Sequence, residues 1–268
     1  SWVTRAPALI SMPEFTYVKL CRADHALAAT TSNLVCRYVV VFTNYRYESK
    51  PPSLETNMPP IFYDYAPAPS PRRARIFLAE KGIEVENVQI DMGTAEQLSD
   101  AYRLINPACT VPALKLEDGT VLTENMGIAA WAEAICPKPP LLGTSPTEKG
   151  LVSTWNAKIE FEGLFAIAEI LRNSSKGMVD RATTGPINYA QIPELAARGQ
   201  LRLGHFFETL NQRLEGRDFI AIDQFSLADI SALVVVDFAK WVRMAPAPEH
   251  TNTHKWYAAI SARPSASV

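Results

Sequence analysis

The pair Ser70-Pro71 has residue types that could hold a negative charge. Ser is a preferred N-cap and Pro a preferred first helical residue, so the pair predicts the start of a helix. The first turn of a helix is its positive end, and a hydroxyl there can donate a hydrogen bond to an anion. The alternative is that Ser70 only caps its helix. Tyr63 and Tyr65 share one face of the preceding strand and are alternative donors, although at least one should pack in the core.

The cysteines favour a reducing compartment. All four stand far apart, at positions 21, 36, 109 and 136, without Cys-x-x-Cys or metal-ligand spacing. We therefore expect no disulfide framework and no metal site. Cys109 should behave as a small buried residue, although its neighbourhood makes a reactive thiol worth testing.

Charge and hydropathy exclude several kinds of partner. The formal net charge is −2, which argues against a broad nucleic-acid-binding face. Apolar stretches such as Leu233–Phe238 are too short to span a bilayer. The first residues lack the pattern of a secretory signal. The sequence predicts a cytoplasmic protein with neither nucleic acid nor membrane as partner.

Residues 58–140 predict a small α/β domain. Strand signals at 61–65, 85–90, 113–116 and 121–122 alternate with helical signals at 70–82, 94–105 and 124–135. Asp118-Gly119 is a hairpin turn, and Pro112 leads into the third strand. The order is βαβ, an irregular helix, then ββα, which is the thioredoxin-like order.

Residues 147–268 predict an all-helical domain. A long helical pattern runs from Thr147 to Asn173, and another includes Leu203 and Leu214. Phe225–Ile230 contains a capping box, in which Ser226 and Asp229 satisfy each other's backbone amides. This motif is structural whatever the protein does.

Residues 1–57 lack sustained periodicity and end in the breaker-rich run Lys50–Ser53. We expect a disordered extension, or non-native upstream sequence with the natural start at Met58. A regulatory or targeting arm is the alternative.

Several of these segments together resemble the glutathione S-transferase family. The likeness spans about Met58 to Val268, in the family's order. It is carried by the segments 61–65, 70–83, 106–114, 122–125, 225–229 and 256–264. Within the family, Ser70-Pro71-Arg72-Arg73 looks closest to a microbial branch without an obvious catalytic tyrosine.

The resemblance implies glutathione as co-substrate, lying across the edge of the small sheet. Ser70, or a neighbouring amide, would hold the thiolate. The backbone of Val111, before a cis Pro112, would pair with the cysteinyl backbone. Glu124 suits the γ-glutamyl amine, and Asn125 suits its carboxylate, although the family usually has Ser there. Gln97 would meet the glycyl end, and a solvated helix face is the alternative for this residue.

The second substrate would lie between the two domains. Trp155, Phe161 and Phe165 are candidates for the wall of this electrophile pocket, and ordinary packing between helices is the alternative. Arg72 and Arg73 could attract an acidic ligand or lie on a solvated helix face. A homodimer is expected from the resemblance alone.

Two classes of function follow. The first is a detoxification enzyme that conjugates glutathione to small hydrophobic electrophiles, with glutathione peroxidase activity as a possible side reaction. The second is a non-catalytic binding or regulatory module with the same fold. A thioredoxin-type oxidoreductase is disfavoured, because no cysteine stands near Ser70.

Overall fold

The computed structural model describes residues 59–268, which belong to one compact unit, Leu54–Val268. The predicted extension at 1–57 lies outside the described residues. The predicted domain boundaries, 58–140 for the α/β domain and 147–268 for the helical domain, stay predictions from the sequence. None of the helices between residues 59 and 268 is long and apolar enough to cross a membrane.

A four-stranded sheet forms the first part, with spatial order β2-β1-β3-β4. Its strands are β1 (Ile61–Asp64), β2 (Glu86–Gln89), β3 (Ala113–Lys115) and β4 (Val121–Leu122). β2 runs parallel to β1, β3 antiparallel to β1, and β4 antiparallel to β3. This mixed sheet confirms the thioredoxin-like prediction.

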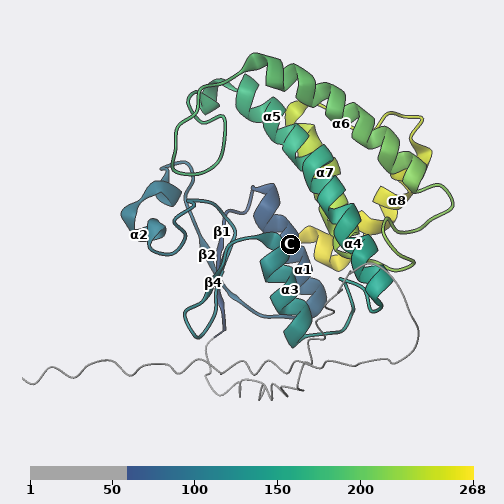
Figure 1. The fold of residues 1–268 in the computed structure, drawn as a ribbon, viewed down its shortest axis with the longest axis horizontal. Helices are drawn as coiled ribbons and strands as arrows, with labels where there is room; N and C mark the ends of the chain where they lie inside the picture. The colour runs from purple at the N-terminus through teal and green to yellow at the C-terminus, as the bar shows by residue number, and fades with distance from the viewer. Residues whose placement is uncertain (1–58) are drawn as a thin grey trace, which may run out of the picture. The chain divides into compact units, whose positions relative to one another are not determined.

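Helices cover both faces of this sheet (Figure 1). They are α1 (Pro69–Lys81), η1 (Glu96–Leu98), α2 (Asp100–Arg103) and α3 (Asn125–Ile135). Alternate residues of a strand point to opposite faces. Phe62 accordingly joins the core that includes α1 and α3, while Tyr63 packs edge-to-face on Tyr102 of α2.

The helix expected over 94–105 is instead two short turns. Ser99 is extended, and its hydroxyl accepts a hydrogen bond from the amide of Tyr102. Ser99 therefore ends η1 and caps a new helix, because a serine oxygen at this position competes with the backbone ladder.

The second part is helical. Its segments are α4 (Pro146–Lys158), η2 (Ile159–Leu164), α5 (Phe165–Ser174), η3 (Lys176–Met178), α6 (Pro193–Arg213), α7 (Leu227–Ala239), η4 (Lys240–Val242), α8 (Thr251–Ser261) and η5 (Pro264–Ser267). The helical pattern predicted to Asn173 is present as α4, η2 and α5, with η2 a π-helical turn. A Cβ added to Gly163 in η2 would lie 3.0 Å from Val235 of α7, so the π-turn approaches α7 closely.

Helix α7 is buried along nearly its whole length. The predicted capping box is present at its start, where the Asp229 carboxylate accepts from the amide and the hydroxyl of Ser226. α7 shares one hydrophobic core with α1, which joins the two parts of the fold. The chain thus has the predicted thioredoxin-like domain followed by a helical domain.

Candidate active site at the sheet edge

The strand directions bring the predicted site residues to one edge of the sheet. The carboxyl ends of the parallel strands β1 and β2 lie there and lead to α1 and η1. β3 is antiparallel to β1, so its amino end, just after Val111-Pro112, lies at the same edge. β4 reverses again, so its carboxyl end leads from this edge into Glu124-Asn125. Ser70, Gln97, Val111 and Asn125 therefore belong to elements that begin at a common edge.

Helix α1 begins earlier than the sequence pattern indicates. Its N-cap is Ala68, with no side-chain cap, and Pro69 is its first residue. The capping role considered for Ser70 is therefore wrong: Pro69 can open the helix, because it has a fixed φ and no amide hydrogen to leave unpaired. The amide and the hydroxyl of Ser70 make no hydrogen bond to another described residue. With prolines on both sides, Ser70 has the only N–H among residues 69–71, so it presents a free amide and a hydroxyl at the positive end of α1.

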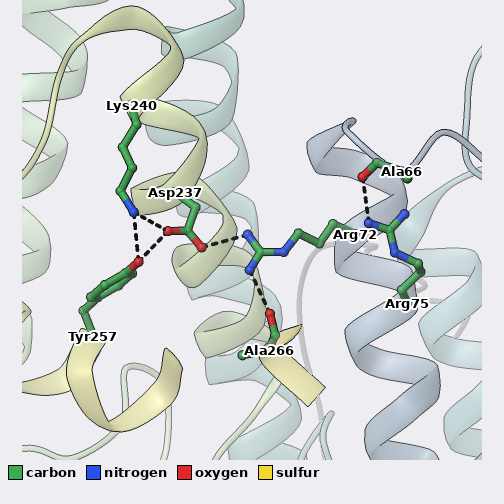
Figure 2. A network of polar contacts seen from close by, with 7 residues as sticks. All are labelled: Ala66, Arg72, Arg75, Asp237, Lys240, Tyr257 and Ala266. Atoms are coloured by element: carbon green, nitrogen blue, oxygen red, sulfur yellow. Dashed lines mark hydrogen bonds and ion pairs between the residues drawn. The ribbon is translucent and has the colours of Figure 1, made fainter. Parts of the chain in front are cut away.

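Polar side chains hold the turn between β1 and α1. Arg75 of α1 donates to the buried carboxylate of Asp64 and to the Ala66 carbonyl, the latter seen in Figure 2. The Gln89 side chain accepts from the Ala66 amide at 2.9 Å. This turn is therefore fixed both from α1 and from the neighbouring strand β2.

Arg72 does not lie on a solvated helix face, as one alternative suggested. Its Nη1 lies 2.7 Å from Asp237 Oδ2 at the end of α7, and its Nη2 donates to the Ala266 carbonyl (Figure 2). Asp237 also accepts from Lys240 and Tyr257. The first turn of α1 is therefore anchored to two segments of the helical domain, α7 and η5.

Arg73 is buried against the π-turn. Its guanidinium pairs with Glu160 and lies 3.4 Å from the hydroxyl of Ser231. Burial lowers the pKa of Arg73, while Glu160 and the more distant Glu124 raise it. Arg73 thus provides positive charge in the neighbourhood of Glu124. Its partner Glu160 is 87 residues away in the chain, so no local signal predicts the contact.

The Val111–Pro112 peptide bond is cis, as the resemblance implies. The amide and carbonyl of Val111 make no hydrogen bond to another described residue. The preceding carbonyl, that of Thr110, accepts from Tyr102 and Asn106, which hold the segment from behind. Cys109 is buried, as expected, and has φ +54°, a conformation that favours glycine.

Two of the proposed ligand side chains are buried with an unpaired oxygen. Gln97 is 7% exposed and Asn125 is 8% exposed, and neither side-chain oxygen has a hydrogen-bond partner among the described residues. Glu124, the N-cap of α3, is exposed and makes no side-chain cap. Since buried polar atoms are nearly always paired, Gln97 and Asn125 are suited to meet a polar ligand.

The two tyrosines of the first strand have different environments. Tyr63 is 9% exposed and belongs to the core beneath α2. Tyr65 lies just beyond β1 and is partly exposed. Tyr65 is therefore the tyrosine that is more accessible to a ligand.

The aromatic residues predicted for the electrophile pocket lie elsewhere in the helical domain. Phe161 and Phe165 are 65% and 60% exposed and line a groove of about 390 Å³ with Arg198 and Arg202 of α6. Trp155 lies between Lys158 and Arg213, with both cations over its ring. These positions differ from the expected place between the domains, because the three rings lie near arginines of α6, whose main neighbours among the described elements are α5, η2 and α8.

The other hollow of note is also remote from the sheet edge. It has a volume of about 500 Å³ and is lined by residues 215–219, 222 and 223, in the connection between α6 and α7. Within residues 59–268, no three His, Cys, Asp or Glu side chains are grouped so that they could hold a metal ion.

Comparison with known proteins identifies the class. The family model "Glutathione S-transferase, N-terminal domain" matches residues 68–135, and "Glutathione S-transferase, C-terminal domain" matches residues 178–264. Glutathione S-transferase 2 of Saccharomyces cerevisiae is 32% identical over 211 residues, which cover 76% of this chain and 87% of the yeast protein. The chain therefore belongs to the glutathione S-transferase family.

Solved structures agree. The crystal structure of Gtt2 from Saccharomyces cerevisiae has a TM-score of 0.71 and 30% identity, and covers 77% of this chain and 98% of Gtt2. A glutathione transferase homologue from Sulfitobacter, solved with bound glutathione, shares the fold at a TM-score of 0.66 and 22% identity, covering 78% of this chain and 96% of the homologue.

Proposed function

We propose that the protein is an enzyme that conjugates glutathione to small hydrophobic electrophiles at the sheet edge. The observation that carries the proposal is the pair of buried, unpaired oxygens on Gln97 and Asn125. A buried acceptor without a donor costs about 1–3 kcal/mol, and a ligand with amide and amine hydrogens would remove that penalty. Glutathione has both kinds of donor.

The free backbone at Val111 supports the same placement. An extended peptide can add to an open strand edge through main-chain hydrogen bonds. In the proposed complex the cysteinyl residue of glutathione pairs with Val111, and the γ-glutamyl end meets Glu124 and Asn125. Gln97 meets the glycyl end.

Ser70 is the proposed activator of the thiol. A free thiol has a pKa of about 8.5, and lowering it by about 2 units requires roughly 2.7 kcal/mol of preferential thiolate stabilisation. The hydroxyl and amide of Ser70, at the positive end of α1, are suited to provide part of it. The thiolate then attacks the electrophilic carbon, a carbon–sulfur bond forms, and the leaving group departs with its electron pair.

Reduction of a peroxide is a proposed side reaction of the same thiolate. One glutathione attacks a peroxide oxygen and releases an alcohol, and a second glutathione then yields the disulfide and water. These two reaction steps require no further residue of the protein.

For the electrophile wall we propose Phe238 and Trp241 in place of the rings that face α6. Their ring centroids are 5.4 Å apart, and Trp241 is 54% exposed. They flank the end of α7, where Asp237 binds Arg72, two residues after Ser70. A homodimer and a cytoplasmic location remain proposals from the family.

The test is glutathione binding and turnover by the full chain and two Gln→Met variants. The full chain should bind immobilised glutathione and accelerate its reaction with 1-chloro-2,4-dinitrobenzene. Gln97→Met, which removes the acceptor proposed for the glycyl N–H, should raise the KM for glutathione about threefold to tenfold, the scale of one lost neutral hydrogen bond. Gln200→Met, on an exposed face of α6, is the matched control and should change nothing.

The outcomes separate the two classes of function. Glutathione binding without acceleration would support the non-catalytic module. No binding at millimolar glutathione would reject both. Equal effects of the two Gln→Met variants would remove Gln97 from the site.

A further inference from the structure

The connection between α5 and α6 carries two arginines that hold its shape. Arg172, near the end of α5, donates through Nη1 to the carbonyls of Arg181 and Thr183. Arg181 donates to the Gly185 carbonyl and to the side chain of Asn188. Both arginines are partly exposed, so neither is enclosed by the loop that it supports.

Neither arginine has a carboxylate partner. Within residues 59–268, no acidic oxygen lies within 4.0 Å of either guanidinium; seven other arginines have such a partner, whereas Arg103, Arg213 and Arg243 do not. The pKa of Arg172 is lowered by burial and then by the charge of Arg181, and no acid offsets either effect. Two like charges are therefore held close together without a counter-charge.

Arg213 provides the contrast. It also donates to two backbone carbonyls, at Ile220 and Ala221. Burial and the charge of Arg217 lower its pKa, Asp223 raises it, and the ring of Trp155 lies 5.0 Å from its guanidinium carbon. An acid and an aromatic ring thus partly compensate the charge of Arg213. Among the described residues, neither kind of compensation is present at Arg172, whose pKa is lowered by burial and by Arg181 alone.

The loop that the arginine pair holds lies against the segment that leads to Val111. Gly185, whose carbonyl Arg181 holds, approaches the sheet edge so closely that an added Cβ would lie 3.5 Å from the Ala108 carbonyl. Ala108 stands three residues before Val111. Figure 1 shows the same connection descending from the end of α5 toward α2 and the sheet. Arg181 therefore belongs to the loop that lies against the segment before Val111, and Arg172 holds this loop from the end of α5.

We propose that Arg172 and Arg181 bind a carboxylate of a ligand held at this edge, so that the enzyme favours carboxylate-bearing reactants. This inference rests on the proposed function. A guanidinium binds a carboxylate through charge-assisted, often paired hydrogen bonds. The carboxylate has two possible sources: the electrophile, or the glycyl end of glutathione.

Matched substrates distinguish these sources. 4-Chloro-3,5-dinitrobenzoate and the corresponding benzamide react alike with a thiolate: the carbon–sulfur bond forms and chloride leaves. They differ in one negative charge. Glutathione and its glycyl monoethyl ester differ in the same way at the other reactant. All four combinations are measured with the full-length wild type, Arg172→Gln, Arg181→Gln and the control Arg213→Gln.

If the electrophile supplies the carboxylate, each of the first two variants lowers kcat/KM for the benzoate about tenfold to a hundredfold, the range of a hydrogen bond to a charged group. The benzamide is then unaffected. If the glycyl end supplies it, these variants lower kcat/KM for glutathione and not for its ester, with either electrophile. Arg172→Lys, which keeps the charge, restores part of the activity, and Arg213→Gln shows no charge preference.

A loss shared equally by all four combinations would show that the arginines only support the loop, and would overturn the proposal.

Binding of the preformed conjugates by calorimetry gives a second readout that needs no turnover. If the chain proves inactive, a preference for the benzoate conjugate that disappears in Arg172→Gln still supports the carboxylate site. Equal affinity for benzoate and benzamide conjugates, and for their glycyl esters, would reject it. Failure of the proposed function is recognised separately, as absence of turnover with the benzamide.

Discussion

At the scale of single residues, the neighbours of Ser70 decide what it can do. Pro69 opens α1, so Ser70 lies inside the first turn and is not needed as a cap. Pro69 and Pro71 have no amide hydrogen, which leaves the Ser70 N–H as the free donor of that stretch. One serine can therefore direct two donors at the same anion.

Ser70→Ala removes one of these donors and should lower turnover about tenfold to a thousandfold, as loss of one donor to a developing anion does elsewhere. Because the hydroxyl has no partner among the described residues, the free energy of unfolding should change by less than about 1 kcal/mol. Steady-state kinetics and urea denaturation measure the two effects. Tyr65→Phe is the control. A loss of turnover in Tyr65→Phe, with none in Ser70→Ala, would transfer the role to the tyrosine.

At the scale of elements, the start of α7 is the strongest local feature. The buried carboxylate of Asp229 accepts hydrogen bonds from four groups: the amides of Ile220 and Ser226, the Ser226 hydroxyl and the Trp256 indole. Burial raises the pKa of Asp229 to about 6, and these four donors only partly oppose it. α7 is thus stabilised by a carboxylate whose charge is itself costly in the interior.

This raised pKa predicts how stability depends on pH. Relative to about 3.9 in the unfolded chain, a folded pKa of about 6 means that the folded state binds the proton more tightly. The contribution of Asp229 is therefore largest below about pH 4 and is lost as the pH rises through about 6. Asp229→Asn abolishes this dependence.

The measurement is urea denaturation of wild type and Asp229→Asn at pH 5 and pH 7. Asp229→Asn should be less stable than the wild type at both pH values, because the new side-chain amide would lie against the hydrogen-bond donors that the carboxylate accepts from. The difference in unfolding free energy between the wild type and Asp229→Asn should be greater at pH 5 than at pH 7, by about 1–2 kcal/mol. A difference that is greater at pH 7 would show that the four donors outweigh burial.

At the scale of the whole described fold, polar contacts join α1 to the helical domain. Besides Arg72 with Asp237, the Glu80 carboxylate of α1 pairs with Arg263 and accepts from Ser265. Burial of Asp237 would raise its pKa, but the hydrogen bonds from Lys240, Tyr257 and Arg72 hold it below its usual value. The helical domain thereby fixes the helix that carries Ser70.

A double-mutant cycle of Arg72→Met and Asp237→Asn tests this coupling. Both side chains are about three-quarters buried, so we expect a coupling energy of about 1 kcal/mol at pH 7. Because the pKa of Asp237 is lowered, the coupling should disappear as the pH falls below that pKa. Arg72→Met should also raise the KM for glutathione. Arg198→Met with Glu169→Gln, a pair within the helical domain, should leave that KM unchanged.

Local chemistry was enough to predict most of the elements. The hairpin turn at Asp118-Gly119, the capping box at Ser226 and the thioredoxin-like order are short-range features, and they are present. The helix expected over 94–105 failed because Ser99 competes with the backbone there. The electrophile residues stay a prediction: helical spacing places Phe161 and Phe165 on one face, but only the structure shows that this face meets arginines of α6.

By itself, the sequence determined the fold class and the residue types available for glutathione, because caps, turns and strand alternation act over a few residues. Only the tertiary structure decided which groups converge. The register of β1, β3 and β4 brings Val111 and Asn125 to the edge where α1 begins. Arg72 meets Asp237 across 165 residues, and the loop of Arg181 reaches Ala108. Such contacts depend on the packing of whole elements, and no local spacing in the chain encodes them.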